Sequence, residues 1–178
     1  MRIIGGILKG RIFKAPQNLP VRPTTDMAKE ALFNILNNQY DFDNITVLDL
    51  FSGTGSVGLE FASRGTSELT LIDKHPACIS WLKKMLQEFD FKQAEVIKTD
   101  VFKWLQSPGN NTYDIIFADP PYDLPNLANI PKLIFENQYL KPSGILVLEH
   151  PSYLKFDQLD YFKEKRKYGN STFSFFGL

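Results

Sequence analysis

The sequence has a single cysteine among its 178 residues, no net formal charge and no long apolar run. One cysteine, Cys78, excludes an internal disulfide framework and any zinc site built from several cysteines. No apolar segment approaches the roughly 20 residues of a membrane-spanning helix. Ile3–Leu8 is too short for a signal-peptide core and is interrupted by two glycines. We therefore expect a cytoplasmic protein without membrane association.

The composition that remains is that of a globular chain, with 43% hydrophobic and 22% charged residues, and its length fits one domain. The charge is unevenly distributed, because residues 1–29 hold six Lys and Arg but a single acid, Asp26. A basic arm on an acidic body indicates contact with a polyanion, although short basic segments are often only solvated. The candidate RNA-binding residues are Arg2, Lys9, Arg11, Lys14 and Arg22.

Apolar strand-like segments alternate with helical patterns, which predicts an α/β fold with a doubly wound, mostly parallel sheet covered on both faces. The expected strands are Ile45–Leu50, Glu68–Asp73, Ala94–Lys98, Asp114–Ala118 and Gly144–Glu149. The expected helices between them are Ser56–Arg64, Pro76–Phe89, Asp100–Gln106 and Asn126–Glu136. At the C-terminal end, Tyr161–Tyr168 and Ser171–Phe176 flank Gly169-Asn170 and predict an antiparallel pair.

The first 23 residues are expected to form a separate arm. Gly5-Gly6 lies between two short apolar runs and predicts a small β-hairpin, and a proline-rich connector follows. Thr24 or Thr25 is a suitable N-cap for a helix whose buried stripe includes Ala28, Leu32 and Leu36. We therefore divide the chain into a hairpin arm with connector, 1–23, and a main domain, 24–178.

A glycine-rich turn follows the first predicted strand of the main domain. Gly53, Gly55 and Gly58 satisfy the dinucleotide-binding pattern, and Asp73 lies 20 residues after Gly53, where a ribose-binding carboxylate is expected. The pattern alone is ambiguous, because NAD and S-adenosylmethionine both present an adenosine to such a crevice.

Three features favour S-adenosylmethionine as the cofactor. Asp49 precedes the glycines, where a carboxylate suits a cationic methionine end but would repel a pyrophosphate. Asp100 ends the third strand, where it suits an adenine amino group. A dehydrogenase also needs a substrate domain that 178 residues do not provide. The expected cofactor-binding residues are Asp49, Phe51, Ser52, Gly53, Thr54, Gly55, Asp73, Lys74, Asp100 and Val101.

The tetrapeptide Asp119-Pro120-Pro121-Tyr122 follows the fourth strand and is the candidate catalytic motif. Asp119 offers a carboxylate and Pro120 a main-chain carbonyl, two acceptors for the two hydrogens of an exocyclic amino group. Such acceptors would orient the nitrogen lone pair toward a methyl donor. Tyr122 offers a flat face on which a base can stack. The motif predicts methyl transfer to an amino nitrogen with no metal ion.

Taken in this order, these residues resemble the class I methyltransferases that act on amino nitrogens, and within them the RsmD family, which methylates guanine N2 in 16S ribosomal RNA. The specific part of the resemblance is Arg22–Thr24 followed by Glu30–Asn34. The resemblance implies a seven-stranded sheet, an N-terminal hairpin that helps hold RNA, and a monomer acting on 16S rRNA, within a small subunit or an assembly intermediate. It also implies that Arg22 and Thr24 lie near the site entrance.

The sequence departs from the family pattern at Met27 and Lys29, where the family usually has arginines, so an RNA grip at that place would be weaker or differently placed. Other functions stay open at this point. The same fold and tetrapeptide would serve methylation of adenine N6 in DNA or RNA, or of a protein amide, although protein-amide enzymes generally have Asn at position 119. A nicotinamide-dependent oxidoreductase and a non-catalytic RNA-binding module are the remaining alternatives.

Overall fold

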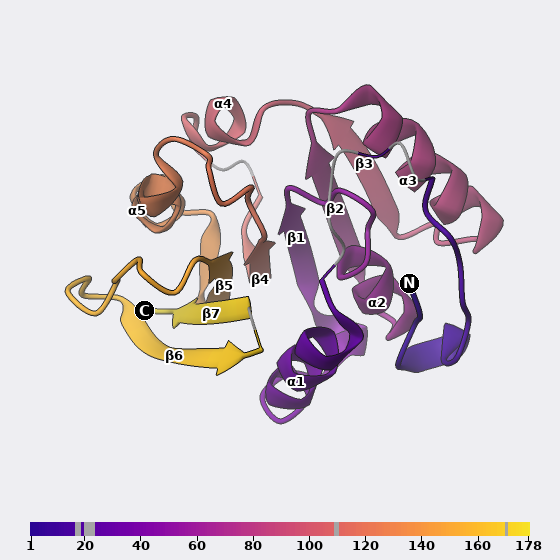
Figure 1. The fold of residues 1–178 in the computed structure, drawn as a ribbon, viewed down its shortest axis with the longest axis horizontal. Helices are drawn as coiled ribbons and strands as arrows, with labels where there is room; N and C mark the ends of the chain where they lie inside the picture. The colour runs from indigo at the N-terminus through magenta and orange to yellow at the C-terminus, as the bar shows by residue number, and fades with distance from the viewer. Residues whose placement is uncertain (17–18, 20–23, 109–110, 170) are drawn as a thin grey trace.

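The computed structural model describes residues 1–16, 19, 24–108, 111–169 and 171–178, and its strands form one mixed sheet in the order β3-β2-β1-β4-β5-β7-β6 (Figure 1). The strands are β1 Thr46–Leu50, β2 Glu68–Asp73, β3 Ala94–Lys98, β4 Tyr113–Ala118, β5 Leu140–His150, β6 Phe162–Tyr168 and β7 Ser171–Phe176. The α-helices are α1 Asp26–Leu36, α2 Gly58–Ser63, α3 Pro76–Glu88, α4 Val101–Leu105 and α5 Ile130–Glu136. Short 3-10 turns are η1 Gly6–Leu8, η2 Phe42–Asn44 and η3 Leu127–Asn129.

The sheet is parallel through its first five strands and antiparallel at one edge. β1 pairs in parallel with β2 and β4, β2 with β3, and β4 with β5, whereas β7 runs antiparallel to both β5 and β6. The chain moves outward from β1 to β3 and then returns to place β4 on the other side of β1. The carboxyl ends of β1 and β4 therefore border the position where ligands bind in doubly wound sheets.

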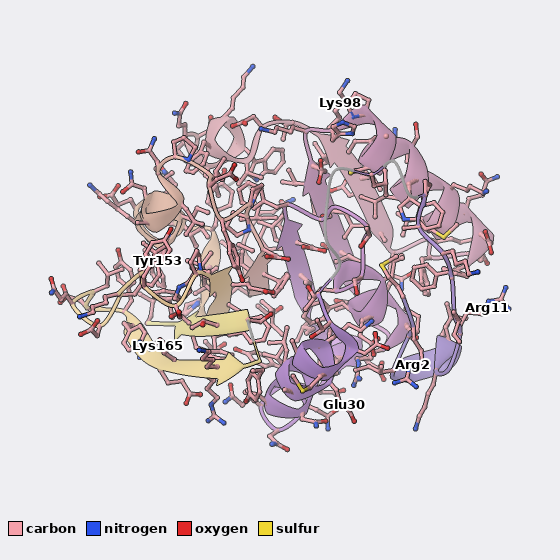
Figure 2. The ribbon with its side chains drawn as sticks, viewed as in Figure 1. Arg2, Arg11, Glu30, Lys98, Tyr153 and Lys165 are labelled. Atoms are coloured by element: carbon pink, nitrogen blue, oxygen red, sulfur yellow. The ribbon has the colours of Figure 1, made fainter. Side chains whose placement is uncertain are left out.

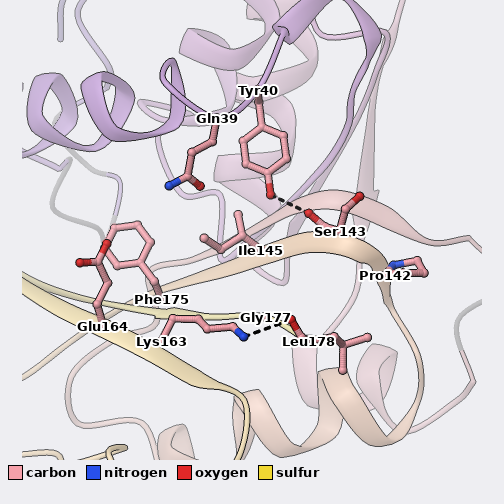
Figure 3. A pocket seen from close by; sticks show the side chains of 11 residues that line it. Gln39, Tyr40, Pro142, Ser143, Ile145, Lys163, Glu164, Phe175, Gly177 and Leu178 are labelled. Carbon is pink, nitrogen blue, oxygen red and sulfur yellow. Dashed lines mark hydrogen bonds between the residues drawn. The ribbon is translucent and has the colours of Figure 1, made fainter.

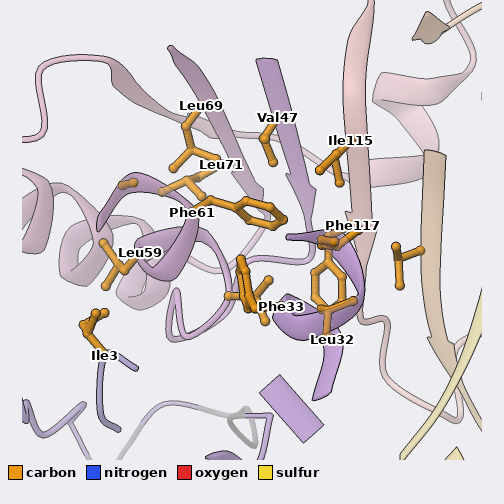
Figure 4. Packing of buried hydrophobic residues seen from close by; sticks show 14 of the residues in the cluster. Ile3, Leu32, Phe33, Val47, Leu59, Phe61, Leu69, Leu71, Ile115 and Phe117 are labelled. Carbon is orange, nitrogen blue, oxygen red and sulfur yellow. The ribbon is translucent and has the colours of Figure 1, made fainter. Parts of the chain in front are cut away.

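Two apolar clusters cover the two faces of the sheet, as the alternation of strands and helices predicts. α1, α2 and α3 pack on one face, where Phe33 and Phe61 meet the strand residues Val47 and Phe117 (Figure 4). α4 and α5 pack on the other face. Val47 of β1 lies on the face that α1 covers. Because successive strand side chains alternate between faces, Asp49 points toward the same face. The predicted doubly wound fold is confirmed.

Helix α1 begins at the predicted place. Thr25 is its N-cap, since its hydroxyl oxygen accepts a hydrogen bond from the Ala28 amide at 3.2 Å. Ala28, Leu32 and Leu36 are fully buried, so the predicted apolar stripe is the face that packs on the sheet. Within the described residues, none of the helices is long and apolar enough to cross a membrane.

The prediction of a β-hairpin around Gly5-Gly6 is wrong in its detail. The two runs do lie antiparallel, but they share a single bridge, Arg2 with Ile12, and the second run begins with the 3-10 turn η1. Backbone hydrogen bonds still join the two runs, since the Ile3 amide donates to the Arg11 carbonyl at 2.9 Å and the Gly10 amide to the Ile3 carbonyl at 2.8 Å. Side chains of α2 bind the backbone between them. The Ser63 hydroxyl donates to the Gly5 carbonyl at 2.7 Å and accepts from the Leu8 amide at 3.0 Å. The arm is therefore bonded both to itself and to the main domain.

A buried lysine completes this attachment. The Lys29 ammonium, fully excluded from solvent, donates to the Arg2 carbonyl at 2.6 Å and lies 3.7 Å from the Glu60 carboxylate. It also reaches the Ser56 carbonyl at 3.4 Å, at the end of the glycine-rich turn. Burial lowers the Lys29 pKa, while Glu60 opposes that shift. Lys29 thus joins the arm, α1, α2 and the glycine-rich turn.

Candidate active site

The loop after β1 turns sharply and lies close to its neighbours. Phe51, Gly53 and Gly55 have φ values of 62°, 52° and 77°, in the left-handed region that favours glycine. A Cβ on Gly55 would come within 2.5 Å of Leu82 Cδ2. The Trp81 indole N–H donates to the Thr54 carbonyl at 3.0 Å and holds the loop from the α3 side. The loop is therefore a fixed turn whose backbone only glycine permits at Gly55.

Asp73, at the end of β2, holds the other side of this loop. Its Oδ2 accepts a hydrogen bond from the Gly53 amide at 2.9 Å, and its Oδ1 accepts from the His75 amide at 2.7 Å. Each carboxylate oxygen keeps a second lone pair. The structure thus places Asp73 beside the glycine loop, where the sequence predicted the ribose-binding carboxylate.

Asp49 lies beneath the loop and faces the start of α2. Its carboxylate lies against Gly58, where an added Cβ would come within 2.7 Å of Oδ2, and its carbonyl accepts from the Ser52 hydroxyl at 2.8 Å. Burial, and then the charge of Asp73, raise the pKa of Asp49 to about 8. The carboxylate is therefore ready to be stabilised by a nearby cation, and its contact with the methionine end of a cofactor remains a prediction.

The tetrapeptide lies directly beside the glycine loop. Ala118 pairs with Leu50 across β1 and β4, and the Asp119 amide donates to the Leu50 carbonyl at 3.4 Å. Pro120 is buried, whereas the Tyr122 side chain is 43% exposed. The two motifs, which are 64 positions apart between Gly55 and Asp119, thus meet at the switch point of the sheet.

Asp119 belongs to a small cluster of acids. Burial, and then the charges of Glu149 and Asp49, raise its pKa well above the ordinary value, while the Thr24 hydroxyl opposes the shift. Thr24 lies just before α1 and its hydroxyl acts on the Asp119 carboxylate, so the structure brings it to the site, as the resemblance implied. Arg22 lies outside the described residues.

Glu149 was not among the residues that the sequence analysis selected. It occupies the next-to-last position of β5, in the register position after the pair of Ala118 with Leu148. Its Oε1 accepts a hydrogen bond from the Tyr122 hydroxyl at 3.3 Å. The available signal was an acid directly after the apolar run 145–148. This run belongs to β5, which pairs with β4, the strand before Asp119.

The remaining predicted cofactor residues occupy varied positions. The Asp100 side chain caps α4, since Oδ1 accepts from the Lys103 amide at 3.1 Å, and its predicted contact with adenine remains a prediction. Val101 is buried in the cluster beneath α4 and α5, and Lys74 is exposed. Ser52 and Thr54 are buried within the loop.

The basic arm is exposed at one flank of the molecule (Figure 2). The Arg2 guanidinium lies 3.5 Å from Asp26, and that of Arg11 lies 3.9 Å from Glu88. These ion pairs are open to solvent, so they are weak and can be exchanged for contacts to phosphate. Lys9 and Lys14 are also exposed.

The two departures from the family pattern have different surroundings. The Met27 side chain is 59% exposed, whereas Lys29 is fully buried in the ion pair with Glu60. The Lys29 side chain therefore supports the fold, and the expectation that the RNA grip at these two positions is weaker or differently placed stays a prediction.

A surface hollow lies away from these residues (Figure 3). It is lined by the start of β5 and the end of β7, and the Tyr40 hydroxyl crosses it to the Ser143 carbonyl at 3.0 Å. Because β5 begins here and ends at His150, next to Glu149, this hollow lies at the opposite end of the strands from the two motifs.

The fold and the paired motifs at the switch point define an α/β protein of the methyltransferase class. A solved precorrin-6y C5,15-methyltransferase from Geobacter metallireducens shares this fold with a TM-score of 0.64, at 15% identity, over 92% of this chain and 91% of that chain. The family model described as "Conserved hypothetical protein 95" matches residues 1–177, and the chain belongs to this family.

Two relatives are much more similar. The ribosomal RNA small subunit methyltransferase D of Haemophilus influenzae is 34% identical over 152 residues, which cover 84% of this chain and 78% of the relative. The solved structure of the Thermus thermophilus protein TTHA0928 gives a TM-score of 0.86 at 29% identity, over 100% of this chain and 99% of that one. The predicted membership of the RsmD family is confirmed.

Proposed function

We propose that this protein transfers a methyl group from S-adenosylmethionine to the exocyclic N2 of one guanine in 16S ribosomal RNA. The substrate is the RNA within a small ribosomal subunit or an assembly intermediate, and the enzyme acts as a cytoplasmic monomer. The class of enzyme follows from the relatives named ribosomal RNA small subunit methyltransferase D: the chain is an S-adenosylmethionine-dependent rRNA methyltransferase.

The residues of the glycine loop suit this cofactor. The left-handed turn at Gly53 and Gly55 lets a ligand approach the backbone closely, and Asp73 lies beside the loop with a spare lone pair on each oxygen. Asp49 lies near the loop with its pKa raised to about 8, so a cationic ligand would stabilise its ionised form, whereas a pyrophosphate would oppose ionisation. When bound, S-adenosylmethionine supplies the methyl group.

The observation that carries the proposal is the contact between the two motifs, through the Asp119 amide and the Leu50 carbonyl. An exocyclic amino nitrogen is a poor nucleophile because its lone pair is delocalised into the ring. The Asp119 carboxylate and the Pro120 carbonyl accept hydrogen bonds from its two N–H groups. These bonds turn the nitrogen lone pair toward the glycine loop. Tyr122 presents an exposed ring for stacking, which contributes ~1–3 kcal/mol per base.

The basic arm supports RNA as the substrate. Arg2, Lys9, Arg11 and Lys14 place exposed positive charge on a segment that Lys29 and Ser63 fix to the main domain. Contacts of this kind to phosphate position a nucleic acid without reading its sequence.

The direct test is an incubation with labelled S-adenosylmethionine and small ribosomal particles from cells that lack this enzyme. The proposal predicts incorporation of about one methyl group per particle, and less into particles that are already modified. Absence of incorporation into both particles and naked 16S RNA would contradict it.

A further inference from the structure

The buried Glu149 has an unused hydrogen-bonding position at the proposed active site. Its side chain is 5% exposed, and its Oε2 is buried without a hydrogen-bond partner among the described residues. Its other oxygen, Oε1, accepts from the Tyr122 hydroxyl at 3.3 Å. Leaving a buried carboxylate oxygen without a donor is unfavourable, because the group has lost its hydrogen bonds to water without replacement. Among the described residues, no donor meets this oxygen with hydrogen-bond geometry, so the site leaves room there for a donor from a bound ligand.

The position of Glu149 points to a donor on the substrate. β4 and β5 are adjacent and parallel, so the ends of these strands bring Asp119 and Glu149 to one edge of the sheet, on the face that α1 covers. The negative charge of Glu149 raises the pKa of Asp119, in agreement with the placement that the strand register gives. Tyr122 connects them, since it belongs to the same tetrapeptide as Asp119 and donates to Glu149.

The chemistry of the bases then selects one partner. Among the four RNA bases, only guanine has a ring N–H donor, N1–H, next to its exocyclic amino group. In adenine and cytosine the ring nitrogen next to the amino group is an acceptor. A carboxylate beside the acceptors of the amino group would bind N1–H of guanine and would repel the lone pair of the other two bases.

We propose that Glu149 is a specificity-determining residue, whose Oε2 accepts the N1–H of the target guanine while Asp119 and Pro120 hold its N2 amino group. Tyr122 is a positioning residue for this contact, because its hydroxyl occupies Oε1 and leaves Oε2 free for the base. This inference rests on the proposed function. It explains how a tetrapeptide shared with adenine-modifying enzymes can serve a guanine-specific site.

The test compares guanine with 2-aminopurine at the target position of a synthetic 16S RNA fragment. 2-Aminopurine keeps the 2-amino group that accepts the methyl but has an acceptor at N1. The wild-type enzyme is expected to prefer guanine by at least about tenfold in kcat/KM. In Glu149→Gln, whose amide can donate to N1 of 2-aminopurine, kcat/KM for guanine should fall about 10- to 100-fold and the preference should shrink about tenfold or more.

Controls separate this role from a structural one. Glu136→Gln makes the same change on the exposed surface of α5, where Glu136 pairs with Lys132, and should leave the preference unchanged. Glu149→Gln should keep the affinity for S-adenosylhomocysteine and should not lower the melting temperature. A role confined to the fold would instead lower the melting temperature and leave the preference between the two bases intact.

Two results would overturn the inference, and they can be told apart from failure of the proposed function. Equal methylation of guanine and 2-aminopurine by the wild-type enzyme would exclude recognition of N1–H whether or not the variant folds. An unchanged preference in a folded Glu149→Gln would exclude Glu149 as its source. Absence of N2 methylation by the wild-type enzyme on any substrate would instead contradict the proposed function itself.

Discussion

Acidic side chains gather at the carboxyl ends of β1, β4 and β5, and burial raises the pKa of Asp49, Asp119 and Glu149. For Asp49 and Asp119, burial is the main cause and a neighbouring carboxylate is the second. Carboxylates that are kept close together in a buried site destabilise the fold, so they mark a place where chemistry takes priority over stability.

Asp119→Asn tests the central carboxylate. The amide keeps the shape but offers a weaker acceptor, and its N–H₂ group can repel the hydrogens of the target amine. We expect kcat/KM for methyl transfer to fall by about 10²–10³. Affinity for S-adenosylhomocysteine, measured by calorimetry, should stay within about twofold. Asp123→Asn, an exposed change in the same loop, is the matched control and should have no effect. Equal loss of transfer and of affinity would assign Asp119 to the cofactor.

The raised pKa of Asp49 makes a prediction about stability and pH. The carboxyl loses its proton near pH 3.8 when unfolded and near pH 8 when folded, so folding favours the protonated form. The free energy of unfolding should be highest at the acidic end of this range and should fall as the pH rises from about 4 to about 8.

Asp49→Asn removes this contribution, because the amide carries no titrating charge. Urea unfolding between pH 5 and pH 8 should show a shallower decline for Asp49→Asn than for the wild type. Over these three pH units, the upper limit of the difference is about 4 kcal/mol. Asp157→Asn, an exposed substitution, should keep the wild-type slope. Parallel slopes for Asp49→Asn and wild type would contradict the assignment.

The sequence was sufficient to select Asp73, Asp119 and Tyr122, because each follows a strand within a recognisable motif. It did not select Glu149, because an acid at the end of an apolar strand has no meaning until the strand order places β5 beside β4. The sequence did select Asp100 as a cofactor residue, but it did not show that this side chain caps α4, because the capping bond depends on local geometry.

Among the elements, the glycine loop is the most sensitive to substitution. Gly55→Ala places a side chain on a left-handed backbone and against Leu82. Gly10→Ala also requires a left-handed backbone, with a φ of 86°, but its added Cβ has no atom within 4 Å. Gly10→Ala should reduce the unfolding free energy by about 1–2 kcal/mol. Gly55→Ala should cost more and should also weaken S-adenosylhomocysteine binding by tenfold or more. Equal effects of the two substitutions would argue against a close approach at Gly55.

The attachment of the arm depends on the buried ion pair of Lys29 with Glu60. Lys29→Met leaves Glu60 buried with one cation fewer and should destabilise the fold by about 3–5 kcal/mol. Lys14→Met, at an exposed position on the arm, should change stability by less than about 0.5 kcal/mol. Urea unfolding measures both variants. A Lys29→Met protein as stable as wild type would show that the pair does not hold the arm.

Most elements begin and end close to the predicted residues, because apolar periodicity and capping are local properties. β2 and β3 match their predicted bounds, while β5 extends from Leu140 rather than from Gly144. The predicted helix at Asn126–Glu136 is divided into η3 and α5. Asn126 has a φ of 64° and lies outside both elements, and Pro131, the second residue of α5, has no amide hydrogen to bond back into η3. The two runs of the arm do pair antiparallel, but the predicted tight turn at Gly5-Gly6 is replaced by η1, where the Ile4 and Leu8 amides bind side chains of α2 more than 50 residues away in sequence.

At the scale of the whole molecule, the doubly wound topology explains why two distant motifs form one site. The return of the chain from β3 to β4 sets the glycine loop and the tetrapeptide side by side, and the antiparallel β7 and β6 complete the sheet beyond β5. The arm then adds positive charge to one flank without contributing a strand to the sheet. A nucleic acid bound by that flank would present one base to the edge where Asp119 lies.

The most direct measurement is the identity of the methylated nucleoside. Small ribosomal particles from cells lacking the enzyme are incubated with S-adenosylmethionine, the 16S RNA is digested to nucleosides, and the products are separated and identified by mass spectrometry against standards. The account predicts N2-methylguanosine, at one position, in an amount that Asp119→Asn greatly reduces. N6-methyladenosine as the product, or no new methylated nucleoside, would contradict it.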